Sequence, residues 1–156
     1  MRTSRILIAS LAFGFTHPAM AQTTAKPDTA AVRAAVNAAS AKLNAAYLAG
    51  DAAAVAGLFT EDARAEYAGF PSAKGRAAIQ STYDTYFNSN KLTVAETTIM
   101  EVTALTPDLV TAGGTYHSFG NGKPKHAWWR WAAAYRKGAD GEYRISYIMA
   151  FPDSTK

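Results

Sequence analysis

Six aromatic side chains with a polar tip are the residues of this sequence best suited to bind or transform a small molecule. Each combines a flat apolar ring, which stacks on other flat groups, with a hydroxyl or indole N–H that forms hydrogen bonds. A cavity lined by such side chains suits a flat aromatic or polycyclic ligand. The alternative for each ring is that it fills the core, as aromatic residues at core spacing usually do. The six residues are Tyr47, Tyr67, Tyr83, Tyr116, Trp129 and Trp131.

Two neighbouring strands are expected to position the last three of these rings. Residues 109–119 and 125–137 are rich in β-branched and aromatic residues and are separated by a turn sequence, which predicts a hairpin. Side chains alternate between the two faces of a strand, so the hairpin has an inner and an outer set. The inner set is Tyr116, Trp129 and Trp131, and the outer set is His117, Trp128 and Arg130. A bulge at the adjacent Gly113 and Gly114 would exchange the two sets.

Helices are expected to supply the remaining positions around a pocket. Apolar residues recur every three or four positions between residues 29 and 49, which predicts an amphipathic helix. Asp51 is expected to cap a short second helix over 52–59, and Gly75 to open a third over 76–88. The apolar stripe of the first helix consists of Val32, Val36, Ala39, Leu43 and Tyr47.

The remaining segments predict strands of an antiparallel meander. Residues 63–68 form a first candidate strand, 92–105 precede the hairpin, and 142–151 are expected to close the sheet. Three helices followed by a meander indicate an α+β fold, and 156 residues are enough for one domain with one core. The apolar face of 92–105 is expected to include Leu92, Val94, Glu96, Thr98, Met100 and Val102, with Glu96 as the odd residue on it.

The start of the chain is typical of an export signal. A basic start is followed by an apolar stretch too short to cross a bilayer, and Ala19–Ala21 has the small-x-small pattern of a cleavage site. The alternative is a buried N-terminal helix. We expect a signal peptide at 1–21, a linker at 22–28 and one domain over 29–153, in a periplasmic or secreted protein with no membrane anchor.

Composition excludes several classes of function. Removal of the signal leaves 14 basic and 12 acidic residues, so 14 − 12 gives a formal charge of +2. This weak charge and the lack of a basic run argue against nucleic-acid binding. The chain has no cysteine, which excludes disulfides and thiolate metal sites. No nucleotide-binding loop, dinucleotide fingerprint or metal-ligand cluster is present in the sequence, so we expect no cofactor and no metal.

The order of these elements, together with three segments, resembles the NTF2-like superfamily. The segments are YLAGDAAAVAGLFTED at 47–62, GRAAI at 75–79 and DGEYRISYIMAF at 140–151. Within the superfamily the chain is most similar to SnoaL-like and SgcJ/EcaC-type proteins and to ketosteroid isomerases. The resemblance covers most of the mature chain. It implies a cone-shaped, cystatin-like fold, in which a curved antiparallel sheet wraps around three N-terminal helices and encloses a pocket.

The catalytic pattern of the ketosteroid isomerases is not matched residue by residue. By position, the hydrogen-bonding tyrosine of that pattern falls on Leu43, its carboxylate base on Tyr67 and its buried carboxylic acid on Trp131. One supporting tyrosine does have a match, at Tyr83. Dehydratases of the superfamily use histidine and aspartate in the cone, whereas the mature chain has two histidines on adjacent predicted strands.

Four ionisable residues are further candidates for a functional site. Glu96, if it faces the cone, would serve as an acid or base, and otherwise it is a solvated strand end beside Lys91. His117 has either an acid/base role or the role of a polar interface residue. Arg130, if inward, would hold a carboxylate or enolate, and otherwise it pairs across a dimer interface. Glu66 would act as a base if its strand shifted by one residue.

Three functions therefore remain open. The first is an exported, cofactor-independent lyase or isomerase-type enzyme that acts on an aromatic or polycyclic small molecule, with Tyr67, Tyr83 and His117 as acid/base residues. Its substrate-binding residues would be Tyr47, Tyr116, Trp129, Trp131, Arg130 and Glu96. The second is a non-catalytic protein that binds a small apolar or aromatic ligand. The third is an association domain that forms a homodimer through the outer sheet face around Trp128. A contacting acid/base pair favours the first, a pocket lined only by rings the second, and a filled cone the third.

Overall fold

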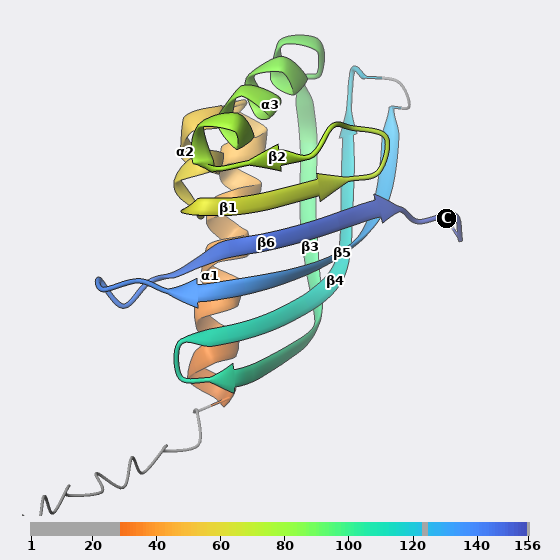
Figure 1. Cartoon of the computed structure of the whole chain (residues 1–156). Helices are drawn as coiled ribbons and strands as arrows, with labels where there is room; N and C mark the ends of the chain where they lie inside the picture. The colour runs from red at the N-terminus through yellow and green to blue at the C-terminus, as the bar shows by residue number, and fades with distance from the viewer. Residues whose placement is uncertain (1–28, 123–124, 156) are drawn as a thin grey trace, which may run out of the picture.

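The alanine-rich segment after residue 28 folds into a long helix that lies against a curved sheet (Figure 1). The computed structural model describes residues 29–122 and 125–155, so the expected signal peptide (1–21) and linker (22–28) lie outside the described residues. In chain order the elements are α1 (Thr29–Ala49), α2 (Ala52–Gly57), β1 (Phe59–Tyr67), β2 (Ala73–Lys74), α3 (Arg76–Ser89), β3 (Leu92–Thr106), β4 (Leu109–Gly120), β5 (His126–Lys137) and β6 (Tyr143–Pro152). No helix among the described residues has the length and apolar character needed to cross a membrane.

The glycine–aspartate step between α1 and α2 has the predicted conformation. Gly50 has a φ of 66°, in the left-handed region where helices commonly end on glycine. Asp51 caps α2 by accepting a hydrogen bond of 2.8 Å from the amide of Ala54. Helix α2 ends earlier than predicted, because Phe59 begins β1 and pairs with Ile145 of β6.

The sheet contains six strands in the order β2-β1-β6-β5-β4-β3. Strands β3 to β6 form the predicted antiparallel meander. Strand β6 was expected to close the sheet, but it is an interior strand, because β1 pairs with its free edge in parallel. The two-residue strand β2, which was not among the predicted strands, pairs with β1 at the edge. The helices α2 and α3 lie at this end of the sheet, and α1 packs mainly against β3 (Figure 1).

The hairpin of β4 and β5 has the predicted register. Its pairing runs without a shift from Leu109 opposite Arg136 to Phe119 opposite His126. No bulge therefore occurs between these two strands, and the inner and outer sets of side chains are those predicted. The inner set is Tyr116, Trp129 and Trp131.

The predicted apolar face of β3 is wrong in its middle part, at Glu96, Thr98 and Met100, although Leu92 and Val102 are buried and Val94 is partly buried. Its pairing with β4 shifts near the start of the strand, in the middle and near the end. From Val94 to Ile99 the buried or partly buried residues are Val94, Ala95, Thr97 and Ile99, whereas Glu96 and Thr98 are exposed. Met100, at the second shift, is also exposed. Each bulge exchanges the two faces, so a single alternation over the whole strand cannot hold.

The core lies between the helices and the concave face of the sheet. Its fully buried large side chains come from α1, α2, α3, β1 and β4, so most of the elements contribute to one cluster. These residues are Phe59, Ile79, Val36, Val55 and Val110. Toward the open end of the cone the packing is incomplete and a pocket remains.

Candidate ligand-binding site

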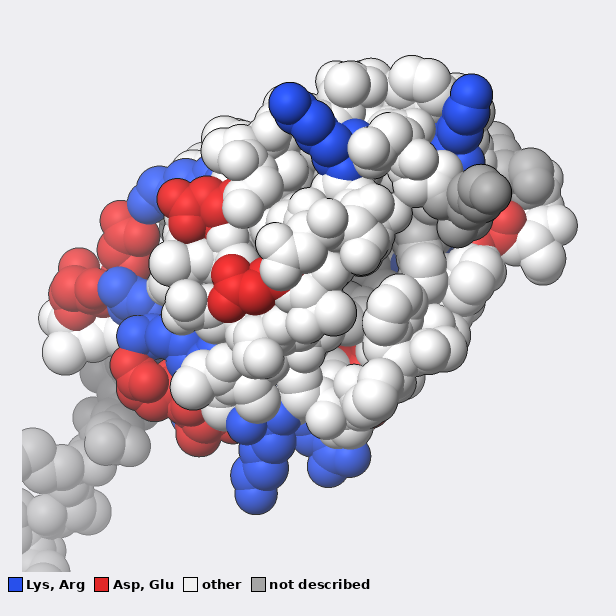
Figure 2. Space-filling view, turned by 90° about the horizontal axis from the view of Figure 1, so that it is seen from above, with Lys and Arg blue, Asp and Glu red and all other residues white. Residues whose placement is uncertain are grey.

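A pocket opens between α1, α3 and the inner face of the sheet, with a cavity of about 130 Å³. Among the described residues that line it, none has a charged side chain. They are Ser40, Leu43, Tyr47, Tyr67, Phe70, Thr82, Tyr83, Tyr86, Thr97, Tyr116, Trp129, Trp131, Tyr135, Ile145, Ile148 and Ala150. Figure 2, a view from above, shows a hollow among uncharged residues, with most charged side chains toward the edges of that face. The cone is therefore neither filled nor charged inside.

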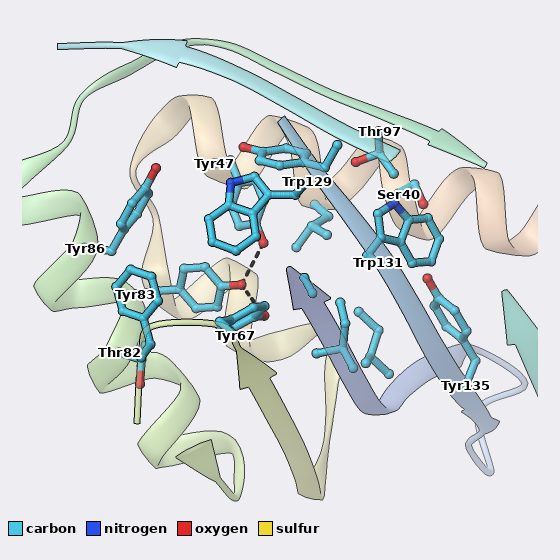
Figure 3. Close-up of a pocket in the computed structure, with 16 residues that line it drawn as sticks. Ser40, Tyr47, Tyr67, Thr82, Tyr83, Tyr86, Thr97, Trp129, Trp131 and Tyr135 are labelled. Carbon is cyan, nitrogen blue, oxygen red and sulfur yellow. Dashed lines mark hydrogen bonds between the residues drawn. The ribbon is translucent and has the colours of Figure 1, made fainter. Parts of the chain in front are cut away.

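Three tyrosines from three different elements meet at one side of this pocket, and we call them the phenol cluster: Tyr47, Tyr67 and Tyr83. The hydroxyl of Tyr83 lies 2.7 Å from that of Tyr47 and 2.5 Å from that of Tyr67 (Figure 3). Tyr47 comes from α1, Tyr67 from the end of β1 and Tyr83 from α3. The central hydroxyl belongs to Tyr83, whose side chain is buried.

Burial makes these phenols weak acids. It raises the pKa of Tyr67 to about 12, partly opposed by the hydrogen bond with Tyr83. Burial also raises the pKa values of Tyr47 and Tyr83 well above their ordinary value, and the neighbouring phenols add to the effect. The pKa of Tyr116, whose ring packs edge-on against Tyr47, is likewise raised by burial. At neutral pH these groups are protonated, so they can donate hydrogen bonds but cannot act as bases.

The polar groups at the other end of the pocket have protein partners. The indole N–H of Trp131 donates a hydrogen bond of 3.1 Å to the backbone oxygen of Thr115. The hydroxyl of Thr97 donates to the side-chain oxygen of Asn44 over 2.7 Å. Burial raises the pKa of Tyr135 to about 12, partly opposed by a hydrogen bond with Ser40. The polar groups at this end are therefore mainly used within the protein, and the phenol cluster is the end of the pocket that can offer a hydrogen bond to a ligand.

The structure brings six of the nine predicted site residues together and leaves three outside. Tyr47, Tyr67, Tyr83, Tyr116, Trp129 and Trp131 all line the pocket. His117, Arg130 and Glu96 do not, because they lie on the outer face of the sheet. His117 stacks on Trp128 at 3.9 Å, Arg130 pairs with Asp153 of the same chain at 3.3 Å, and the side chain of Glu96 is 71% exposed. The outer positions of His117 and Arg130 are those that alternation predicts. The predictions that His117 acts beside the tyrosines and that Arg130 and Glu96 bind substrate are corrected, because none of the three lines the pocket.

Glu66 also lies away from the pocket. Its carboxylate accepts hydrogen bonds from Ser72 and Arg64, and these bonds hold its pKa below the ordinary range. Tyr67 lines the pocket and Glu66 does not, so the conditional role of Glu66 as a base has no support.

Ten of the sixteen lining residues are not among the predicted site residues, and three of them show which signals the sequence offers. Tyr86 lines the pocket, and its spacing of three residues from Tyr83 on one helix is the signal that places both on the same side. Ser40 lies one helical turn from Val36, so the periodicity of α1 also places it inward. Phe70 lies in the turn after β1, where no periodicity operates, and it is 49% exposed at the pocket.

Comparisons with known proteins agree on one fold. A family model described as a SnoaL-like domain matches residues 40–147. No curated protein matches the chain. Among solved structures, a ketosteroid isomerase-like protein from Erwinia carotovora atroseptica superposes with a TM-score of 0.68 at 21% identity, covering 81% of this chain and 96% of that one.

Two further structures from Novosphingobium species are similar. An NTF2-like protein with a cystatin-like fold from Novosphingobium aromaticivorans has a TM-score of 0.63 at 20% identity, over 81% of this chain and 85% of that one. The hexachlorocyclohexane dehydrochlorinase LinA-type3 from Novosphingobium barchaimii has a TM-score of 0.68 at 15% identity, over 80% of this chain and 88% of that one. At these identities the structures establish the cone-shaped NTF2-like fold.

Proposed function

Because the chain belongs to the SnoaL-like domain family, we propose that its cone binds a neutral, mostly apolar, ring-containing small molecule. In this proposal the phenol cluster donates a hydrogen bond to one oxygen of the ligand. The single observation that carries it is the position of three linked hydroxyls in a pocket whose described lining has no charged side chain.

The lining selects against charged ligands. An ion that enters an apolar pocket loses its hydration, and here it meets no opposite charge among the described lining residues. A flat uncharged ring loses little on leaving water and stacks on Trp129 and Trp131. An engineered apolar cavity of about 150 Å³ accommodates benzene. The cavity of about 130 Å³ therefore suits one ring, with any further part of the ligand toward the open side.

The phenol cluster has one hydroxyl proton available for a hydrogen bond to a ligand. Three hydroxyls carry three protons, and the two hydrogen bonds to Tyr83 use two of them. One proton remains for a bond outside the cluster. If Tyr47 and Tyr67 both donate to Tyr83, the remaining proton is that of Tyr83, and both bonds strengthen it as a donor. A carbonyl or ether oxygen complements this single donor.

The second candidate is the lyase or isomerase-type enzyme, and the phenol cluster is the observation that favours it. A buried donor aimed at a carbonyl oxygen stabilises the negative charge that develops there when a neighbouring C–H loses its proton. Two of the similar structures bear the names ketosteroid isomerase-like protein and dehydrochlorinase. Among the described lining residues no carboxylate or imidazole is present to take the proton. In this hypothesis a water molecule or a group of the substrate takes it.

Ligand binding is tested with matched pairs of probes. Mature protein would be titrated with single-ring aromatic ketones and with the corresponding carboxylates, and tryptophan fluorescence and the melting temperature would be recorded. We expect the ketones to quench fluorescence and to raise the melting temperature, and the carboxylates to do neither. Equal binding of both, or binding of neither, would overturn the proposal.

Two variants connect binding to the phenol cluster. Tyr83→Phe removes the central hydroxyl and should weaken ketone binding by roughly 0.5–1.5 kcal/mol. Tyr143→Phe is the matched control, because its hydroxyl bonds to the backbone of Pro107 outside the pocket. Incubation of a bound ketone in heavy water separates the two candidates. Deuterium appearing next to the carbonyl, and lost in Tyr83→Phe, supports an enzyme, and binding without exchange supports a binding protein.

A further inference from the structure

The outer face of the sheet carries a second group of side chains whose chemistry the pocket does not use. His117 lies on β4, His126 begins β5, and Glu96 lies beside His117 on β3. We propose that His117 and His126 form a chelating pair for one divalent transition-metal ion, such as Zn²⁺, Ni²⁺ or Cu²⁺. The proposal is independent of the ligand in the cone.

The spacing of the two imidazoles matches what one ion requires. Nε2 of His117 and Nδ1 of His126 lie 3.4 Å apart. Two metal–nitrogen bonds of about 2.1 Å that enclose a tetrahedral angle of about 109° place their nitrogens about 3.4 Å apart. Imidazole nitrogens are the ligands that zinc, nickel and copper share. An ion between the rings therefore needs little movement of either backbone.

Glu96 lies close enough to the first of these ligands to accept its second N–H after a small rotation of its exposed side chain. Its Oε2 lies 3.6 Å from Nδ1 of His117, which is the ring nitrogen that faces away from His126. Histidines that bind metals generally donate their second N–H to a carboxylate or carbonyl, which fixes the tautomer and makes the ligating nitrogen more basic. A proton on Nδ1 leaves Nε2 of His117 free to bind the ion.

Contacts with neighbouring aromatic rings hold both imidazoles in place, stacked for His117 and tilted for His126. The ring of His117 lies 3.9 Å from Trp128 at an interplanar angle of 15°, and the ring of His126 lies 4.5 Å from Phe119. The two imidazoles are nearly parallel, at 7°. Each contact joins partners or neighbours in the continuous register of β4 and β5. Rings held in this way lose little freedom on binding, which favours affinity.

The protein supplies two ligands, and water completes the coordination. In the described part of the chain, no three His, Cys, Asp or Glu side chains converge on one point that could hold an ion. Structural zinc sites use four protein ligands and catalytic sites three. Because the protein supplies only two of the four ligands of a structural zinc site, we expect a dissociation constant of roughly 1–100 µM.

The test titrates tag-free mature protein with nickel, zinc and copper chlorides. Calorimetry should give one ion per chain, and copper should quench the emission of Trp128, which stacks on His117. His117→Asn and His126→Asn should each weaken binding about 10-fold or more, and Glu96→Gln should weaken it roughly 10-fold. Glu142→Gln is the matched control, an exposed carboxylate paired with Lys42. It should bind as the original protein does.

Thermal melts of each variant without metal check that the fold is kept, and the histidine NMR signals give a second readout. Resonances of both imidazoles should shift together on addition of zinc. Undiminished binding in the His117→Asn/His126→Asn double variant, or absence of binding by the original protein at 1 mM ion (about ten times the weakest expected dissociation constant), would overturn the proposal.

Discussion

The hydroxyl groups of Tyr47 and Tyr83 lie 2.7 Å apart, although the residues are 36 positions apart in the chain. Their rings also pack together, with centroids 5.4 Å apart. Tyr47 lies on α1 and Tyr83 on α3, so the contact links these two helices, as does the edge-on contact of Tyr47 with Phe87. The polar end of the pocket consequently also contributes to the packing of α1 against α3. Substitutions of these tyrosines are therefore expected to alter both ligand binding and stability.

The stability of the protein is expected to fall at alkaline pH. Because burial raises the pKa of Tyr67 to about 12, the folded protein keeps this proton where the unfolded chain, with a pKa of about 10, loses it. The contribution of Tyr67 to the free energy of unfolding should be complete below about pH 10 and should be lost as pH rises toward the folded pKa of about 12. Urea unfolding at stepped pH measures this. Tyr67→Phe should make the fall shallower, and a flat profile would refute the assignment.

Trp131→Ala should weaken ligand binding and also lower stability. Its ring lines the pocket, is only 8% exposed and belongs to the core cluster. Loss of a stacking wall should cost roughly 1–3 kcal/mol of affinity, and loss of a buried ring roughly 3–5 kcal/mol of stability. Binding is therefore measured well below the lowered melting temperature. Unchanged affinity with sharply lower stability would show that the ring is only a core residue.

Gly114→Ala should destabilise the sheet strongly. A Cβ at this position would lie 1.9 Å from the backbone oxygen of Thr98, on the strand that bulges opposite it. A backbone atom cannot move aside easily, so the cost should reach roughly 1–3 kcal/mol or more. Gly57→Ala is the control, because a Cβ there meets nothing within 4 Å. Chemical denaturation should show it neutral or stabilised by up to about 1 kcal/mol, and equal effects at the two sites would contradict the prediction.

We propose that a second copy of the chain covers the outer sheet face. Tyr147, Met149 and Phe151 alternate outward along β6 and are 37%, 42% and 46% exposed, and Trp128 beside them is 39% exposed. A row of exposed apolar side chains on a sheet commonly marks an interface. Light scattering of the mature protein should give a dimer, and Met149→Glu or Trp128→Glu should give monomers. Leu48→Glu, on α1, is the control, and a monomeric original protein would contradict the proposal.

We also propose that export removes residues 1–21, which lie outside the described residues. The motivation is the order of a basic start, a short apolar stretch and the cleavage pattern Ala19–Ala21. The intact mass of protein recovered from a bacterial periplasm should match a chain that begins at Gln22. Replacement of Ala21 by a bulky residue should block this processing. Recovery of a chain that still begins at Met1 would rule the proposal out.

Short-range patterns in the sequence were sufficient for the element types and for part of the site. The stripe on α1, the cap at Asp51 and the alternation along β4 and β5 depend on neighbours within a few residues. Local backbone geometry sets such relations, so they can be predicted without the fold. They place Tyr116, Trp129 and Trp131 on one face of the hairpin, and all three line the pocket.

Only the tertiary structure decided which side chains from distant parts of the chain come into contact with those faces of the helices and strands. The parallel pairing of β1 with β6 carries Tyr67 to Tyr83, and the meeting of α1 and α3 brings Tyr47 to the same hydroxyl. The bulges of β3 turned Glu96 outward, where it meets His117. Contacts of this kind depend on how distant elements cross, and one inserted residue exchanges the faces of a strand. Residue types and local spacing therefore determined which side chains are available, and the packing of the whole chain determined which of them touch.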